Sequence, residues 1–338
     1  MQKTNWNQLP FGYQKTNYNV RCYYRDGKWG VLEVTSSENI NLHMAATCLH
    51  YGQEAFEGLK AFRGKDNKIR LFRWRDNAKR IQQSAKGILL AEVPEDLFEE
   101  AIWKAVELNR EFVPPYGSGA SLYIRPLLLG TGPEVGVKPS SEYLFLVFVT
   151  PVGPYFKEGF KPVDMMISRE HDRTAPLGTG MYKIGGNYAA SLTAIRGAHE
   201  KGFANVLFLD PKEKKYIDEC GPANFFGIKG QTYITPQSPS ILPSITNKSL
   251  IQIAMDLGLK TERRPVAVDE LESFEETGAC GTAAVISPIR KIVDPAKNKI
   301  YTYGSGQPGP VSLQLYNQIR AIQLGDIPDS HHWIDFVD

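Results

Sequence analysis

The sequence predicts an α/β protein of two domains. Its 338 residues are enough for two domains of ordinary size. The first third shows short strand patterns joined by turns, with an Asp-Gly pair at 26–27 as a strong hairpin signal. A proline- and glycine-rich break at 151–155 precedes a second half in which strand and helix patterns alternate. We therefore expect a smaller domain at 1–152, an interdomain connection at 153–162 and a larger domain at 163–338.

The length and composition indicate a globular protein of the size of an enzyme and argue against several other classes. The formal net charge is +2 and the basic residues are scattered, which does not favour a nucleic-acid or anionic membrane partner. No stretch approaches the roughly 20 apolar residues of a membrane helix, and the start lacks an apolar signal segment, so we expect a cytoplasmic protein. Four widely spaced cysteines and six histidines without ligand spacing predict neither a disulfide nor a metal site.

The first predicted domain combines hairpins with two helices. The second helix repeats apolar residues at Phe98, Ile102 and Val106, which predicts a face packed on the core. The run 143–149 is continuously apolar, so that strand should be buried on both faces. In order, the expected elements are strands 20–25, 28–34, 58–63 and 68–73, helices 76–86 and 95–112, and strands 121–128 and 142–150.

The second predicted domain alternates strands with helices. A lysine bracketed by glycines lies in the segment 178–188 (GTGMYKIGGNY), between the first strand and the first helix. After the last helix we expect a polar tail that contains Trp333 and Phe336. The expected elements are strands 163–169, 204–209 and 215–218 and helices 187–201 and 310–324.

The glycine-bracketed lysine, Lys183, is the most distinctive residue of the chain. The flanking glycines allow close approach of backbone, and Tyr182 and Tyr188 offer phenolic hydroxyls nearby. This arrangement suits a lysine that forms a Schiff base with a carbonyl cofactor such as pyridoxal phosphate. An ordinary solvated lysine is the alternative for this segment taken alone.

Such a cofactor requires a carboxylate at its pyridine nitrogen and a donor at its phenolate oxygen. An ionised acid keeps the ring protonated, so that the ring accepts electron density from the substrate carbon. Glu219 fits this role at a predicted strand end, and the adjacent Asp218 is its rival on the opposite strand face. Tyr188 is the nearest donor for the phenolate oxygen, with a core tyrosine as the alternative interpretation.

The cofactor also requires a phosphate site. Phosphate binds well at a helix N-terminus, and the amides of Ile245 and Thr246 lie where a helical pattern begins. A turn of small residues offers the hydroxyl of Thr282. An arginine suits phosphate because its fork makes two charge-assisted bonds. Arg80 on the first predicted helix is the candidate cation, and Arg73 and Arg75 are the alternatives. The first domain supplies material for a substrate pocket, namely Tyr51, Phe56, Tyr123 and Arg125.

Short motifs in a fixed order resemble the class IV pyridoxal-phosphate aminotransferases, and among them the branched-chain amino acid aminotransferases. They stand at 49–58 (LHYGQEAFEG), 123–126 (YIRP), 183–188 (KIGGNY), 219–226 (ECGPANFF) and 281–284 (GTAA). The resemblance covers nearly the whole chain. It implies a two-domain α/β enzyme of fold type IV, with a small α/β N-terminal domain and a larger C-terminal domain whose β-barrel-like core is flanked by helices.

The resemblance also implies an activity. It is the reversible transamination of L-leucine, L-isoleucine and L-valine with 2-oxoglutarate, which gives branched-chain 2-oxo acids and L-glutamate through an imine between Lys183 and pyridoxal phosphate. The alternatives are another class IV activity, such as D-amino acid transamination or aminodeoxychorismate lyase chemistry, and a pyridoxal-phosphate-binding protein without turnover. The loop 131–137 resembles one that reaches the neighbouring subunit's pocket, so a homodimer with shared active sites is implied.

Roles carry over residue by residue. Lys183 resembles the imine lysine and proton carrier, Glu219 the partner of the pyridine nitrogen, and Tyr188 the donor to the phenolate oxygen. The implied phosphate ligands are Arg80, Ile245, Thr246 and Thr282. The implied substrate-binding residues are Tyr51, Phe56, Tyr123, Arg125, Val135, Tyr155 and Ala283. Pro222 departs from the pattern because it lacks the backbone N–H that many members have at this position.

Overall fold

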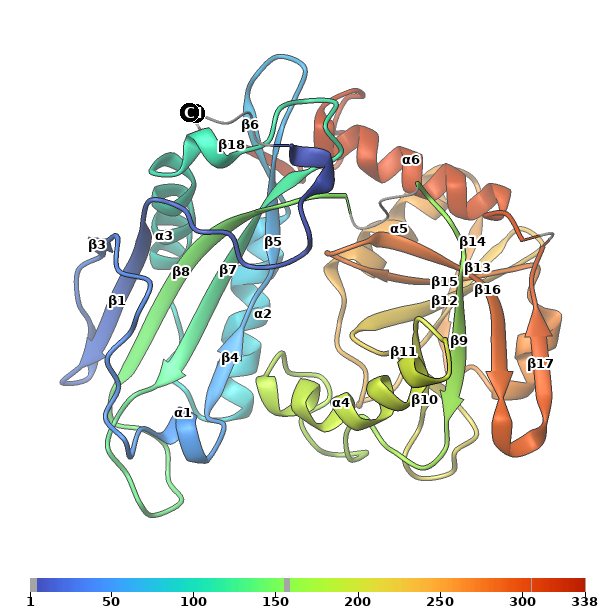
Figure 1. Cartoon of the computed structure of the whole chain (residues 1–338), viewed down its shortest axis with the longest axis horizontal. Helices are drawn as coiled ribbons and strands as arrows, with labels where there is room; N and C mark the ends of the chain where they lie inside the picture. The colour runs from blue at the N-terminus through green and yellow to red at the C-terminus, as the bar shows by residue number, and fades with distance from the viewer. Residues whose placement is uncertain (1–4, 155–158, 305, 338) are drawn as a thin grey trace. The chain divides into compact units, whose positions relative to one another are not determined.

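The computed structural model describes residues 5–154, 159–304 and 306–337 of a mixed α/β protein (Figure 1). It divides into two compact units. The first comprises Met1–Lys157, Tyr182–Gly185 and Ala321–Asp338, and the second comprises Glu158–Met181 and Gly186–Arg320. The lysine segment and the end of the chain thus belong to the first unit and make it the longer one, whereas the sequence predicted the larger domain at the C-terminal side.

An antiparallel sheet forms the frame of the first unit. Its strands follow the order β18-β6-β5-β7-β8-β1-β2, with β3 paired to β1 and β4 paired to β7. Strand β8 is buried except at Phe148, which confirms the prediction of a strand buried on both faces. The strands are β1 (Asn19–Arg25), β2 (Lys28–Trp29), β3 (Glu33–Thr35), β4 (Glu54–Phe56), β5 (Leu59–Arg63), β6 (Ile69–Phe72), β7 (Ser121–Gly130), β8 (Tyr143–Val152) and β18 (Ile334–Val337).

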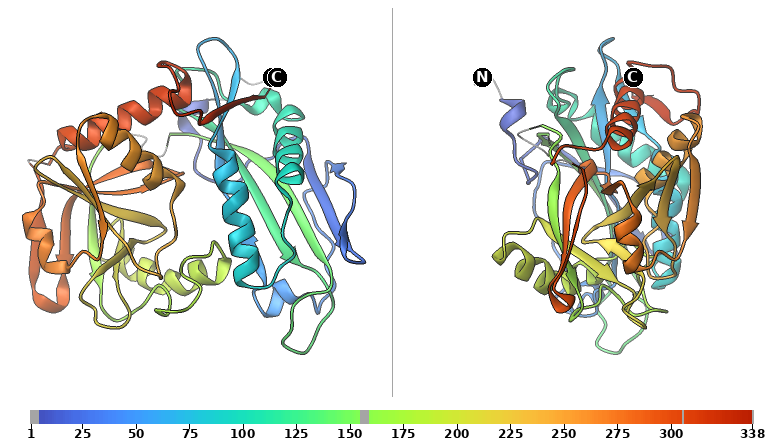
Figure 2. Two further views of the ribbon diagram at one scale, coloured as in Figure 1. Left: turned by 180° about the vertical axis from the view of Figure 1, so that it is seen from behind. Right: turned by 90° about the vertical axis from the view of Figure 1, so that its right-hand side faces the viewer.

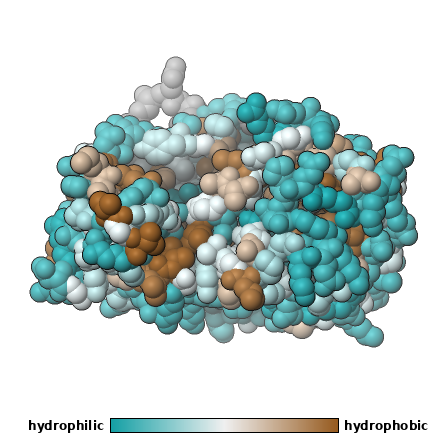
Figure 3. Space-filling model, turned by 90° about the horizontal axis from the view of Figure 1, so that it is seen from below, coloured by the Kyte–Doolittle hydropathy of each residue, from teal (hydrophilic) through white to brown (hydrophobic). Residues whose placement is uncertain are grey.

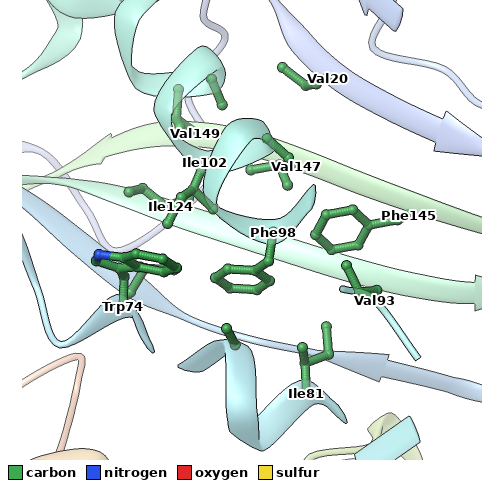
Figure 4. Packing of buried hydrophobic residues seen from close by; sticks show 14 of the residues in the cluster. Val20, Trp74, Ile81, Val93, Phe98, Ile102, Ile124, Phe145, Val147 and Val149 are labelled. Carbon is green, nitrogen blue, oxygen red and sulfur yellow. The ribbon is translucent and has the colours of Figure 1, made fainter. Parts of the chain in front are cut away.

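Helices α2 (Trp74–Gly87) and α3 (Glu95–Glu107) cover one face of this sheet (Figure 2). Phe98 of α3 stacks on Phe145 of β8 with 5.9 Å between ring centroids, within a cluster of fully buried side chains (Figure 4). Burial of a side chain of this size stabilises the fold by about 1.5–3 kcal/mol. The short helix α1 (Thr47–His50) precedes β4.

Helix α3 ends earlier than its apolar pattern predicts. The side chain of Asn109 donates to the Ala105 carbonyl and accepts from the backbone amides of Asn17 and Tyr18. A side chain that bonds to backbone in this way competes with the helical hydrogen bonds. The predicted helix at 95–112 is therefore α3 followed by a separate 3₁₀ turn, Arg110–Phe112.

The end of the chain is a strand, and the prediction of a polar tail was wrong. Strand β18 pairs antiparallel with β6. Trp333 packs edge-on against Phe72, and its carbonyl accepts a hydrogen bond from the Arg73 amide over 2.7 Å. The tail therefore completes the first sheet at one edge, which covers backbone groups that β6 would otherwise expose.

A second sheet closes on itself in the second unit. Its strands follow the order β11-β10-β9-β16-β15-β12-β13-β14, with β17 paired to β16. An additional pairing of β11 with β12 closes the part from β11 to β12 into a ring, which β13 and β14 extend. This closure confirms the β-barrel-like core that the family resemblance implies. The strands are β9 (Val163–Ser168), β10 (Asn205–Leu209), β11 (Ile217–Cys220), β12 (Ala223–Lys229), β13 (Thr232–Pro236), β14 (Lys260–Arg264), β15 (Glu276–Gly281), β16 (Val285–Asp294) and β17 (Lys299–Thr302).

Three helices accompany this ring, namely α4 (Gly185–Glu200), α5 (Ile245–Asp256) and α6 (Pro310–Leu324). The bounds of α6 are those predicted, whereas β14 has the sequence KTERR and carried no apolar signal. No helix of the described residues is long and apolar enough to cross a membrane. The same residues contain no group of three or more metal-ligating side chains. Cys22, Cys48, Cys220 and Cys280 are free thiols.

Candidate functional site

The backbone of Lys183 is held on both sides within the first unit. Its amide donates to the Oγ of Ser84 on α2 over 2.8 Å, and its carbonyl accepts from the amide of Phe56 on β4 over 3.0 Å. Two residues later, the amide of Gly185 donates to the Glu54 carboxylate. A segment that is irregular in sequence is therefore fixed by neighbours from a helix and a strand.

The amine of Lys183 lies in a partly buried position over the Phe56 ring, with 4.7 Å from Nζ to the ring centroid. Burial and the positive charge of Arg80 lower its pKa to about 8, against the opposing charge of Glu57. A minor share of this amine is therefore uncharged at neutral pH and about half of it near pH 8, and only the uncharged amine is a nucleophile or base.

Helix α2 presents a stripe of polar side chains toward this lysine. Asn77, Arg80 and Ser84 follow one another at intervals of three and four residues, which places them on one helix face. Arg80 pairs with Glu57 through Nε to Oε1 at 2.7 Å and Nη2 to Oε2 at 2.8 Å. Sequence reasoning singled out Arg80 alone, although the polar spacing on an otherwise apolar face was a signal for the other two.

A wall of aromatic rings and one arginine lies beside the lysine. The guanidinium carbon of Arg125 is 4.9 Å from the centroid of Phe56 and 5.2 Å from that of Tyr123. Arg125 Nη2 donates to the Tyr123 hydroxyl over 3.0 Å, whereas its Nε is buried without a hydrogen-bond partner among the described residues. The wall can accept an apolar side chain, and the guanidinium can accept a carboxylate.

Tyr51 and Val135 lie on the surface of the first unit. The Tyr51 hydroxyl donates to the carbonyl of Val135 in the loop between β7 and β8. Hydrophobic side chains gather on this face of the unit (Figure 3), and Val135 and Val137 are 82% and 88% exposed. Tyr155, which the sequence also proposed as a pocket residue, lies outside the described residues.

The second unit holds a separate pocket of about 110 Å³. Glu219 is 2% exposed, accepts the Leu242 amide over 2.6 Å and pairs with Arg173 at 3.2 Å. Its rival Asp218 is bound by the hydroxyls of Ser238 and Ser240 and does not line the pocket. The lining residues are Arg173, Asn187, Tyr188, Ser191, Leu192, Ile195, Glu219, Gly221 and Pro222.

Arg173 was missed by sequence reasoning. Its Nη2 donates to the carbonyls of Gly180 and Ser240, and its partner Glu219 lies 46 positions further along the chain. No local motif surrounds this arginine, because all of its partners but Gly180 come from distant segments. Its buried guanidinium places a positive charge next to the Glu219 carboxylate.

The first turn of α5 carries two of the predicted phosphate ligands. Ser244 caps this helix by accepting the Asn247 amide over 3.1 Å, and Ile245 and Thr246 follow with their amides in the first turn. Thr282 and Ala283 lie in the turn between β15 and β16. The next residue but one, Val285, has φ +67° within an i to i+2 turn, so strain is stored beside these residues.

The predicted site residues thus form a group in each unit. The first contains Lys183, Arg80, Phe56, Tyr123, Arg125, Tyr51 and Val135, and the second contains Tyr188, Glu219, Ile245, Thr246, Thr282 and Ala283. Lys183 with its lowered pKa and the paired Arg80 belong to the first group, and the buried Glu219 and the capped start of α5 belong to the second.

Comparisons with known proteins point to one family. The profile described as Amino-transferase class IV matches residues 54–292. A branched-chain-amino-acid aminotransferase of Haemophilus influenzae is 46% identical over 99% of both chains. Branched-chain-amino-acid aminotransferase 5, chloroplastic, of Arabidopsis thaliana is 41% identical over 98% of this chain and 80% of its own.

A solved structure resembles the chain over nearly its whole length. The branched-chain amino acid aminotransferase from Escherichia coli has a TM-score of 0.78 at 27% identity and covers 96% of this chain and 100% of its own. The fold of the chain is therefore shared with a solved enzyme of the same family.

Proposed function

The chain belongs to the class IV aminotransferase family, and from this premise we propose that it is a branched-chain amino acid aminotransferase. It transfers the amino group of L-leucine, L-isoleucine or L-valine to 2-oxoglutarate, and the reaction is reversible. The observation that carries the proposal is the placement of Lys183 Nζ and the Arg125 guanidinium on the same Phe56 ring, at 4.7 Å and 4.9 Å. The amine proposed to react and the guanidinium proposed to select the substrate side chain thereby lie on the same aromatic ring.

The cofactor of the proposed reaction is pyridoxal phosphate, which supplies a carbonyl that reacts with amines and a ring that accepts electron density. Lys183 is the residue that would bind it covalently. Glu219 would hold its ring nitrogen and Tyr188 its phenolate oxygen. Its phosphate would be held by Arg80, the amides of Ile245 and Thr246, and Thr282. Support comes from the family and from the donor chemistry of these residues.

Lys183 is also the proposed carrier of the substrate proton. As a free amine, its Nζ would take the proton from the substrate α-carbon as a base and would later give that proton up as an acid. Burial and the charge of Arg80 lower the pKa of this amine to about 8, so that it can both take up and release a proton at a pH close to that value. The hydrogen bonds of the Lys183 backbone with the Ser84 Oγ and the Phe56 amide limit the movement of the backbone during this transfer.

One wall must accept two kinds of substrate side chain. An isobutyl group can lie on the rings of Phe56 and Tyr123, where no polar partner is required. The side-chain carboxylate of glutamate instead can bind Arg125, whose buried Nε lacks a partner within the described residues. An unsatisfied buried donor costs about 1–3 kcal/mol, and a carboxylate removes this cost. We assign the substrate α-carboxylate to the backbone around Ala283.

The proposal includes a homodimer in the cytoplasm. Met44, Leu49, Val135 and Val137 are exposed apolar side chains in α1 and the neighbouring loops, which is typical of an interaction surface. Val135 in the loop 131–137 would then reach the pocket of the partner subunit, and Tyr51 and Tyr155 would contribute to the side-chain pocket. The four free cysteines fit a reducing compartment. Sedimentation of the wild-type protein and of the Val135→Asp variant tests the dimer, since a charge in the interface should yield monomers.

The decisive experiment follows the visible absorbance of the purified enzyme when L-leucine is added without any oxo acid. Loss of the yellow band, with release of the 2-oxo acid, is the expected result. Restoration of the band by 2-oxoglutarate would complete the cycle. A band that responds only to D-alanine would contradict the substrate assignment, and a protein that takes up no pyridoxal phosphate would contradict the proposal as a whole.

A further inference from the structure

Glu57 is a buried carboxylate that the proposed reaction does not use. It lies between β4 and β5 with no exposed surface. Its two oxygens accept hydrogen bonds from Nε and Nη2 of Arg80, from the side chain of Asn77 at 2.7 Å and from the Gly58 amide at 3.1 Å. Burial raises the pKa of Glu57, but the charges of Arg80 and Lys183 and these bonds outweigh it and leave the pKa below its usual value.

Stability alone does not explain this ion pair. Removing two charges from water costs as much free energy as their attraction returns in many buried pairs, and an apolar pair of similar size is often at least as stable. A buried pair is most useful where a charge must point in a defined direction. Here the directed charge, Arg80, lies one helical turn before Ser84, whose Oγ accepts the Lys183 amide over 2.8 Å, and it lowers the pKa of the Lys183 amine.

The geometry of the pair determines the orientation of the guanidinium. The group is planar and has five N–H donors, of which Glu57 takes one on Nε and one on Nη2. A bidentate contact along this edge fixes the plane and therefore the direction of the remaining donors. An anion bound by Arg80 would therefore meet the guanidinium in an orientation that Glu57 determines.

We propose that Glu57 is a positioning residue, which orients Arg80 toward a phosphate beside Lys183 and offsets the charge of Arg80 at the lysine amine. The phosphate is that of pyridoxal phosphate, so this part rests on the proposed function. The effect on Lys183 requires no cofactor, because both charges belong to the protein.

The test compares binding of pyridoxal phosphate by cofactor-stripped protein, measured by equilibrium dialysis. Glu57→Gln keeps the size of the side chain and removes its charge. We expect its dissociation constant to rise at least about 10-fold, as for the loss of a charge-assisted contact. The matched control is Glu276→Gln, since Glu276 is also buried but binds Val311 and Ser312 at the start of α6. The control should stay within about twofold of the wild type.

Equal binding by Glu57→Gln and the wild type would overturn the inference alone. Failure of the wild type to bind would overturn the proposed function and the phosphate part of the inference with it. A second pair of variants, Arg80→Gln and the double variant Glu57→Gln/Arg80→Gln, covers the case that Glu57→Gln does not fold. The double variant removes both charges, and the two variants should bind equally if Glu57 acts through Arg80. A further tenfold loss in the double variant would contradict this.

Labelling of Lys183 gives a readout that a merely structural role would not change. The rate of acylation of cofactor-stripped protein is followed against pH, and the labelled peptide is quantified by mass spectrometry. Loss of the Glu57 anion should shift the midpoint for Lys183 to lower pH, because the anion raises the pKa of this amine. An unchanged midpoint in Glu57→Gln, with the Glu276→Gln control also unchanged, would overturn the electrostatic part.

Discussion

The Oγ of Ser84 accepts a hydrogen bond from the backbone amide of Lys183 over 2.8 Å, although 99 residues separate them. Ser84 is fully buried on α2, one helical turn beyond Arg80. The same helix therefore positions the lysine backbone and carries the cation that tunes its side chain. This link explains why the segment Tyr182–Gly185 belongs to the first unit.

Replacing Ser84 with alanine should impair turnover more than cofactor binding. The buried Lys183 amide loses its acceptor, and small misplacement of a reacting group can cost up to about 100-fold in rate. Single-turnover conversion of the loaded enzyme by L-leucine measures this effect. Ser249→Ala is the matched control, because Ser249 is a buried helix serine that bonds to the Ile245 carbonyl. Equal rates for both variants would show that the Ser84 bond has no role in positioning.

The lowered pKa of Lys183 predicts a pH dependence of stability for the cofactor-free protein. An unfolded lysine titrates near about 10.4, so the folded protein binds fewer protons between this pH and the folded pKa of about 8. The free energy of unfolding should therefore rise with pH across this window. Below a pH of about 8, the full destabilisation by the buried, protonated Lys183 should be present. Urea unfolding of the wild type and Lys183→Met isolates the effect, since the variant lacks this slope. Parallel pH profiles for the two proteins would refute it.

Arg125→Met should separate the two substrates. Methionine keeps an apolar wall against Phe56 but removes the group that would bind the side-chain carboxylate of glutamate. We expect the KM for glutamate to rise by about 10- to 100-fold, in line with a lost hydrogen bond to a charged group, and that for leucine to change by less than about threefold. Arg290→Met is the control, because Arg290 pairs with Asp164 on the surface. Equal increases for both substrates would argue against the assignment.

Asp335→Ala should destabilise the first unit without affecting the reacting groups. The Asp335 carboxylate on β18 accepts the indole N–H of Trp74 over 2.8 Å, and Trp74 is 1% exposed. Loss of the acceptor leaves a buried donor unpaired, which costs about 1–3 kcal/mol in unfolding free energy. Asp326→Ala removes an exposed bond to Tyr116 and should cost much less. Urea titrations measure both, and equal midpoints would contradict the importance of the Trp74 contact.

The elements with a strong local pattern were predictable from the sequence. Residues 310–324 form the predicted helix with its predicted bounds, and the continuous apolar run 143–149 is a buried strand. Strand β14 and strand β18 were missed. The first is almost wholly charged or polar, and the second is short and pairs with β6 from the opposite end of the chain. Strand β14 carries no hydrophobic period, and the alternation in β18 covers only four residues, which is too short to predict a strand.

In the candidate site, too, some features were predictable from the sequence and others were not. The motifs around Lys183, Glu219 and the start of α5 could be found because their residues are neighbours in the chain. The interactions that tune them could not, since Glu57 meets Arg80 across 23 positions and Arg173 meets Glu219 across 46. A pairwise contact of this kind depends on the register of strands and on the face that a helix presents.

The sequence by itself indicated the family, the α/β class and Lys183 as the candidate imine-forming lysine, because motifs and periodicity are properties of neighbouring residues. Only the tertiary structure decided which charges surround that lysine and which segments complete the first sheet. The physical reason is that a pKa depends on burial and on charges a few ångströms away, and folding brings those charges together from distant parts of the chain.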